Sequence, residues 1–168
     1  YLSLMRDTNI AGVIFSPTRH TLANFASLSI DFPIVMIDRT LRGGQVDSVL
    51  IDNVAAGYQL TAHLVEGGYR RIAGLFGEAS TTGRERRQGF EEAMGAAGLA
   101  PIPELLRYVP ARTEAGYSAA LDLLRLAEPP DALFTTNSLL TAGALQAIHA
   151  RGLRIPEQIA LVGFDETT

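Results

Sequence analysis

The chain contains no cysteine, and this absence removes several kinds of chemistry at once. Without cysteine there can be no disulfide, no thiolate nucleophile and no cysteine-ligated metal site. A cysteine-free chain also fits the reducing environment of the cytosol. The three histidines, at positions 20, 63 and 149, do not cluster, and none stands at metal-ligand spacing from an acid. The sequence therefore predicts no bound metal.

Basic charge and long apolar runs are also scarce. The net charge is −4 and the pI about 5.3, and the longest basic stretch is Arg84–Arg87. Because nucleic-acid-binding domains usually present a basic face, we do not expect this chain to hold DNA by itself. No apolar run approaches the roughly 20 residues that cross a bilayer. No signal peptide is visible, but Tyr1 is not a natural start, so this says little.

Motifs of catalysis and cofactor binding are missing as well. The chain has no GxSxG, Walker A, GxGxxG or HExxH pattern. An enzyme could still pair the carboxylates of Asp52 and Asp165, but two carboxylates at strand ends are common in binding clefts. The sequence therefore favours a binding protein without catalytic residues or cofactor.

What the chain does contain is a series of short apolar runs that each end in a polar residue. The runs and the polar residues that follow them are Gly12–Phe15 with Ser16, Ile34–Ile37 with Asp38, Val49–Ile51 with Asp52, Ala132–Phe134 with Thr135–Asn137, and Ile159–Phe164 with Asp165. Helical patterns fill most of the gaps. This alternation predicts a doubly wound α/β fold with parallel sheets. Ligands of such folds bind outside the carboxyl ends of the strands, where these polar residues stand.

The spacing of apolar residues gives approximate bounds for each element. The predicted strands are Gly12–Phe15, Ile34–Ile37, Val49–Ile51, Ile72–Phe76, Leu105–Val109, Ala132–Phe134 and Ile159–Val162. The predicted helices are Leu2–Met5, as the tail of an earlier helix, Thr21–Leu28, Val54–Glu66 with Asn53 as N-cap, Gly83–Ala97, Thr113–Leu126 and Ser138–Ala150. Helical periodicity places these side chains inside: Ala55, Tyr58, Ala62 and Val65; Phe90, Ala93, Met94 and Ala97; Tyr117, Ala120, Leu121 and Leu124; Ala142, Leu145 and Ile148.

Arg86 is the most informative single residue, because it lies on the apolar face of its predicted helix. It stands one turn before Phe90 and beside the carboxyl end of strand Ile72–Phe76. A guanidinium is rarely buried without a partner, so we expect it to point into the crevice. The alternative is a structural ion pair, or a side chain that extends to solvent.

The other candidates each have an ordinary structural reading. Asp165 can accept hydrogen bonds from two hydroxyls of a sugar-like ligand, or it can be a turn residue. Asn137 and Asp52 can be helix N-caps, and Ser16 and Asp38 can be turn residues. Their common location at strand ends favours a shared ligand site.

The segment that ends at Asp165 resembles the "lRvPedvsvvGfDd" segment of the lac repressor (LacI/GalR) family. The stretches that agree in order and spacing are Ala11–Pro17, Pro33–Arg39, Ile51–Gly57, His63–Gly77, Arg86–Phe90, Asp131–Gly143 and Arg154–Asp165. The resemblance implies the periplasmic-binding-protein-like type I fold, in which two doubly wound parallel-sheet subdomains flank a ligand cleft. Residues 1–51 would be an incomplete N-subdomain, and residues 52–168 a C-subdomain incomplete at its end.

The resemblance also implies roles for single residues. The ligand-binding positions of the family match Arg86, Asp165, Asn137, Asp52, Ser16 and Asp38. Many members carry an aromatic residue near position 111 that stacks on the effector, whereas this chain has Ala111. We therefore expect a small, hydroxyl-rich ligand and not a flat base.

As a whole, the resemblance implies the effector-binding and dimerisation core of a bacterial transcriptional regulator, a repressor. A sugar-like effector would bind between the subdomains and change DNA affinity allosterically. DNA would be held by a helix-turn-helix headpiece absent from this chain, and the protein would be a cytoplasmic homodimer without membrane contact. The alternative is a periplasmic sugar-binding protein of an ABC transporter.

Overall fold

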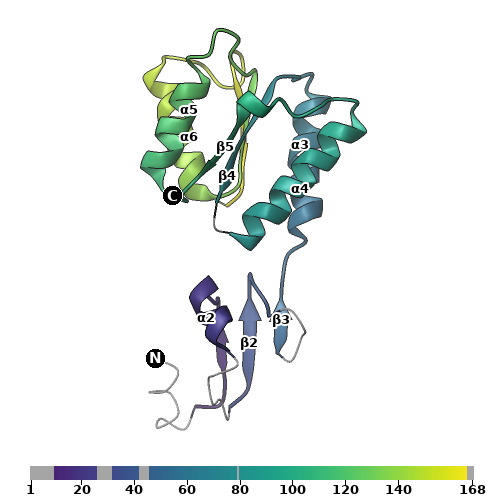
Figure 1. Cartoon of the computed structure of the whole chain (residues 1–168), viewed down its shortest axis with the longest axis vertical. Helices are drawn as coiled ribbons and strands as arrows, with labels where there is room; N and C mark the ends of the chain where they lie inside the picture. Colours follow the sequence, from purple (N-terminus) through teal and green to yellow (C-terminus); the bar gives the residue numbers. More distant parts are fainter. Residues whose placement is uncertain (1–9, 26–31, 42–45, 79, 166–168) are drawn as a thin grey trace. The chain divides into compact units, whose positions relative to one another are not determined.

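The computed structural model describes residues 10–25, 32–41, 46–78 and 80–165. The chain forms two compact units, residues 1–51 and residues 52–168, which are drawn in Figure 1 and are described here one at a time. The helix predicted at Leu2–Met5 lies outside the described residues. Over the described ranges, no helix is long and apolar enough to cross a membrane.

The first unit contains a parallel sheet in the order β1-β2-β3. Its described elements are β1 (Val13–Phe15), α2 (Arg19–Asn24), β2 (Ile34–Ile37) and β3 (Asp47–Val49). The third strand lies earlier than the predicted Val49–Ile51, because β2 offers it no partner beyond the pair Ile37 and Val49. Leu50 and Ile51 follow the strand as exposed apolar residues.

The second unit has three layers, with a parallel sheet in the order β5-β4-β6-β7 between two pairs of helices (Figure 1). Its elements are α3 (Asn53–Glu66), β4 (Ile72–Gly77), α4 (Thr81–Ala96), a 3₁₀ turn (Pro103–Leu105), β5 (Leu106–Val109), α5 (Thr113–Leu123), β6 (Ala132–Thr135), α6 (Ser138–Ala150) and β7 (Ala160–Gly163). This is the α/β architecture with parallel sheets that the sequence predicts. The bounds of α6 agree with the prediction at both ends.

The sheet of the second unit is buried on both faces. Alternate side chains of β4 enter opposite layers: Ala73 and Leu75 pack with α5 and α6, whereas Ile72 and Phe76 pack with α3 and α4. All six residues of β4 are buried, as expected of a central parallel strand covered by helices on both sides. The rigid sheet fixes where its carboxyl edge, and therefore any site there, stands.

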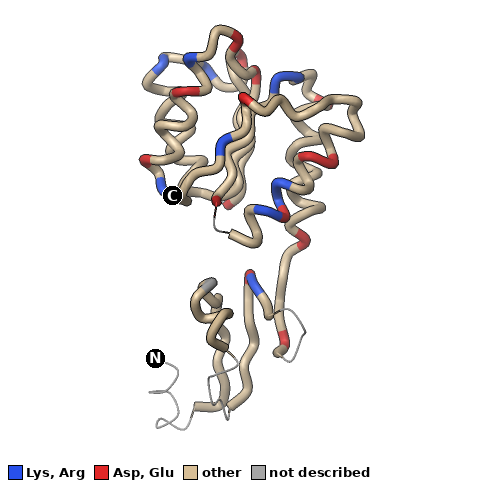
Figure 2. The backbone as a smooth tube through the Cα atoms, in the orientation of Figure 1, with Lys and Arg blue, Asp and Glu red and all other residues tan. Residues whose placement is uncertain are grey.

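Charge is spread over the surface of this unit. Figure 2 shows acidic and basic positions scattered over the helices and loops of this unit, with several basic residues in the first turns of α4. The distribution agrees with the low net charge.

The predicted inward faces of the helices need correction. In α3 the buried residues are Asn53, Gly57, Thr61 and Leu64, and Tyr58 is 38% exposed. In α6 Leu145 is 45% exposed, whereas Ala144, Ala147 and Ile148 are buried. In α5, which ends at Leu123, the predicted face is largely right: Ala120 and Leu124 are buried, and Tyr117 and Leu121 pack against the same core. Ala97, after α4, is exposed.

Glycines explain why the buried faces of α3 and α6 differ from the prediction. Two helices can pack with their backbones in contact only where the residues between them are very small. A Cβ added to Gly57 would overlap the backbone carbonyl of Arg86, and one added to Gly89 would overlap that of Val54. Gly116 and Gly143 bring α5 and α6 together in the same way. Where backbones touch, the smallest residues are at the contact, so large apolar residues beside them stay half-exposed.

Candidate ligand-binding site

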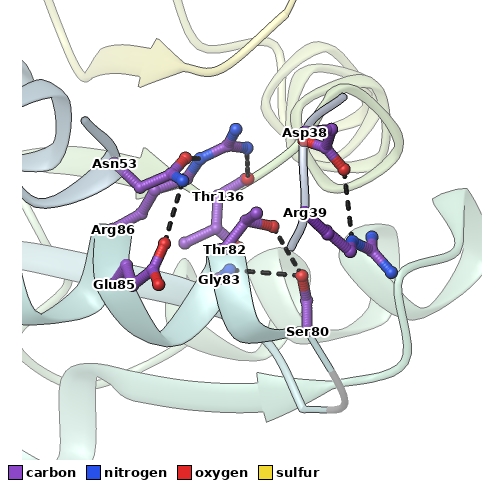
Figure 3. Close-up of polar contacts among 9 residues, drawn as sticks. All are labelled: Asp38, Arg39, Asn53, Ser80, Thr82, Gly83, Glu85, Arg86 and Thr136. Atoms are coloured by element: carbon purple, nitrogen blue, oxygen red, sulfur yellow. Dashed lines mark hydrogen bonds and ion pairs between the residues drawn. The ribbon is translucent and has the colours of Figure 1, made fainter. Parts of the chain in front are cut away.

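Arg86 joins the carboxyl ends of β6 and β7 to the start of α3. Its side chain is only 4% exposed. Its Nε donates a hydrogen bond of 2.8 Å to Oδ1 of Asn53, and its Nη1 donates one of 2.7 Å to the carbonyl oxygen of Thr136 (Figure 3). The guanidinium carbon lies 3.9 Å from the ring centroid of Phe164. Oxygen acceptors and an aromatic face together compensate a buried cation.

Local structure explains how Arg86 reaches this position. Ser80 caps α4 by accepting a hydrogen bond of 3.2 Å from the backbone N–H of Gly83, so the helix begins earlier than predicted (Figure 3). The close contact at Gly57 then holds α3 against the backbone of Arg86. Since Asn53 lies one turn before Gly57, its amide faces the guanidinium.

Asn137 is the N-cap of α6 and lies beside Gly77, the last residue of β4. Its Oδ1 accepts a hydrogen bond of 3.0 Å from the backbone N–H of Leu140. A Cβ built on Gly77 would lie 3.5 Å from Nδ2 of Asn137 and 3.9 Å from Cβ of Ala111, with no overlap. Within the part of the chain that the structure describes, the NH₂ of Asn137 donates no hydrogen bond. It is a donor available to a ligand above Gly77.

The two aspartates that follow β2 and β7 have an unusual backbone. Asp38 has φ of 69° and Asp165 has φ of 65°, and among the described residues they are the only non-glycine residues with positive φ. This left-handed conformation costs about 1 kcal/mol for an L-residue. Strain of this kind tends to gather at functional sites. Asp165 is exposed, and Asp38 is paired with Arg39 at 3.2 Å.

Asp52 and Ser16 have simpler surroundings. Oδ1 of Asp52 accepts a hydrogen bond of 2.9 Å from the backbone N–H of Ala55, which makes Asp52 the N-cap of α3. The sequence offered both Asp52 and Asn53 as this cap, and Asn53 is instead buried against Arg86. Ser16 is exposed and directly follows β1.

The structure thus brings part of the predicted set together. In the second unit Arg86 contacts Thr136, Phe164 and Asn53. These are the chain neighbours of the predicted residues Asn137, Asp165 and Asp52. In the first unit Ser16 and Asp38 follow the neighbouring strands β1 and β2. Sequence reasoning missed the roles of Asn53, Thr136 and Phe164, although each adjoins a predicted site residue.

Tyr108 lies on the edge strand β5 and carries a perturbed hydroxyl. Its ring stacks on Phe76 with centroids 5.5 Å apart, and the guanidinium carbon of Arg87 lies 4.8 Å from its centroid. Burial raises the pKa of Tyr108 above its ordinary value of 10.0; Arg87 opposes this shift and Glu91 adds to it.

The raised pKa of Tyr108 predicts a loss of stability at alkaline pH. In the unfolded chain the phenol loses its proton near pH 10, before the folded phenol does. The stability that the neutral Tyr108 phenol contributes to the folded state is therefore complete below about pH 10, and it is lost as the pH rises through the pKa of the folded state. Thermal melting from pH 8 to 11 should show a smaller alkaline loss for Tyr108→Phe than for the wild type. Identical pH profiles would contradict the shift.

Two α/β units with parallel sheets and polar residues after their strands are typical of a class of ligand-binding proteins, and comparison with known proteins identifies the family. The family model of the periplasmic binding protein-like domain matches residues 61–168. The HTH-type transcriptional regulator DegA of Bacillus subtilis is 34% identical over 99% of this chain and 51% of its own length. A LacI-family regulatory protein of Chloroflexus aggregans superposes with a TM-score of 0.83 at 31% identity, over 98% of this chain and 60% of that one.

A solved complex of the transcriptional regulator CelR with cellobiose is also similar. It has a TM-score of 0.83 and 33% identity, over 98% of this chain and 52% of its own. The chain therefore belongs to the periplasmic-binding-protein-like family, in its LacI-type branch. This confirms the resemblance drawn from the sequence. The chain spans about half the length of the curated relatives it matches.

Proposed function

We propose that this chain is the effector-binding core of a LacI-type transcriptional repressor and that its effector is a small, hydroxyl-rich, sugar-like molecule. The observation that carries the proposal is the convergence on Arg86, which ties together the elements next to Asn137, Asp165 and Asp52. The relatives are named as regulators, one of them in complex with cellobiose, which supports a regulator over a transport protein or an enzyme.

The proposed contacts follow from the chemistry of each group. The carboxylate of Asp165 accepts hydrogen bonds from two ligand hydroxyls, and the NH₂ of Asn137 donates to a hydroxyl above Gly77. Arg86 supplies positive charge at the base of the site. Asp52 in the second unit, and Ser16 and Asp38 in the first, complete the proposed set of ligand-binding residues.

The small residues beside Asn137 favour a ligand of a particular shape. Gly77 and the exposed Ala111 lie beside Asn137, and neither offers an aromatic face for stacking. A site without such a face suits a puckered ring with hydroxyls on its edge better than a planar base.

Residues 1–51 are proposed as part of the N-subdomain, and residues 52–168 as most of the C-subdomain. A ligand can change DNA affinity only if it binds two conformations unequally, and a 100-fold preference corresponds to about 2.7 kcal/mol. The DNA contacts are proposed to come from another part of a cytoplasmic, homodimeric protein.

A thermal-shift screen of sugars tests the proposal. The probes are ribose, glucose, galactose and cellobiose, with hypoxanthine and guanine as planar controls. A sugar at 100 times its Kd stabilises the folded state by about 2.7 kcal/mol, which raises Tm by roughly 5–10 °C. Chemical change of the bound sugar, or stabilisation by the purines alone, would overturn the assignment.

A further inference from the structure

Asn53 is a buried amide held between two charged side chains that come from the same helix. Only 4% of its surface is exposed. Its Oδ1 accepts a hydrogen bond of 2.8 Å from Nε of Arg86, and its Nδ2 donates one of 2.9 Å to Oε2 of Glu85 (Figure 3). Glu85 and Arg86 are neighbours in α4, whereas Asn53 is the first residue of α3.

This arrangement permits a single orientation of the amide. A guanidinium only donates hydrogen bonds, and a carboxylate only accepts them. If the amide turned over, its NH₂ would face Arg86 and its oxygen would face the carboxylate of Glu85, and both bonds would be lost. Glu85 therefore selects the orientation of Asn53, and Asn53 in turn presents an acceptor to Arg86.

The hydrogen bond between Arg86 and Asn53 also links Arg86 to the start of the second unit. Asp52, the residue before it, is the first residue of the second unit and the N-cap of α3. The guanidinium of Arg86 is thus hydrogen-bonded to the first turn of the second unit through Asn53, and to the carboxyl end of β6 through Thr136.

We propose that Asn53 is a positioning residue, oriented by Glu85, that fixes the guanidinium of Arg86 and couples it to the first turn of α3. The part of the proposal that concerns ligand binding rests on the proposed function above. In this arrangement a ligand that contacts Arg86 also acts, through Asn53, on the turn where the second unit starts, in addition to any direct contact with Asp52.

The exchange rate of the Arg86 Nε proton with water tests the coupling without any ligand. It is measured by nuclear magnetic resonance, and the signal is assigned by its absence in Arg86→Lys. Asn53→Ala should accelerate the exchange about tenfold or more, because the hydrogen bond from Nε is removed. Glu85→Ala should also accelerate it, whereas Glu85→Gln should restore slow exchange because its amide oxygen still accepts from Asn53.

A matched control is available on the same helix. Glu92 is an exposed acid that accepts a hydrogen bond of 2.8 Å from Gln88, away from Asn53. Glu92→Ala should leave the Nε proton of Arg86 unchanged. The proposal is overturned if Asn53→Ala leaves the exchange slow, or if Glu85→Ala has no larger effect than Glu92→Ala.

Binding gives the second readout. For the sugar that stabilises the wild type most in the screen, Glu85→Ala should weaken affinity severalfold, and Glu85→Gln should restore it. Failure of every sugar to bind would remove the proposed function but not the coupling, which the exchange rates decide by themselves. Normal affinity in Glu85→Ala, together with fast exchange, would show that the orientation of Arg86 does not serve the ligand and would overturn that part.

Discussion

Gly89→Ala should destabilise the second unit by about 3 kcal/mol, whereas Gly95→Ala in the same helix should stabilise it by about 1 kcal/mol. A Cβ on Gly89 would overlap the carbonyl oxygen of Val54 and lie 2.6 Å from the backbone nitrogen of Tyr58. Both are backbone atoms of α3, so no side-chain rotation can relieve the overlap. The two helices must separate.

Gly95 is the matched control because it lies in the same helix, and nothing stands within 4 Å of the Cβ that alanine would add. Alanine there gains helix propensity without meeting a neighbour. Urea unfolding followed by circular dichroism measures both variants. Equal stability of Gly89→Ala and the wild type would mean that α3 and α4 do not touch at this point.

Asp165→Ala should weaken binding of the effector sugar more than tenfold. Hydrogen bonds to a charged group contribute about 1.5–3 kcal/mol, and the proposed contact includes two of them. Isothermal titration calorimetry with the sugar found in the screen measures the loss. The exposed Asp122 on α5 provides the control, and Asp122→Ala should bind normally.

Backbone strain separates the two effects of changing Asp165. Asp165→Gly removes the same carboxylate but accepts a φ of 65° without cost, so it should gain about 1 kcal/mol of stability over Asp165→Ala. Both variants should lose affinity to a similar degree. Unchanged affinity in both, with the fold intact, would remove Asp165 from the site.

Most strand ends, though not those of β3, and most helix ends could be predicted to within a few residues because local chemistry fixes them. The bounds of α6 follow from Asn137 as its cap and from Gly152, whose φ of 66° suits the residue after a helix. The inward faces could not be predicted from large apolar residues. They depend on Gly57 and Gly89, which make contacts that only the packed helices reveal.

The candidate site shows the same limit. Arg86 stood out in the sequence because a charge on an apolar helix face needs a partner. Its partners could not be named, because Asn53 is 33 residues away and Thr136 is 50 residues away. The backbone strain at Asp165 likewise depends on how the chain leaves β7. The assignment of these residues to an effector stays a prediction until binding is measured.

The contact between α3 and α4 also limits how this sequence can evolve. At most packing contacts a larger residue on one side can be tolerated when a neighbour becomes smaller. Gly57 and Gly89 face backbone atoms and are already the smallest residues, so no compensating substitution exists for either. We therefore expect these two positions to tolerate no other residue, whereas Gly95, a few residues along the same helix as Gly89, can be substituted freely.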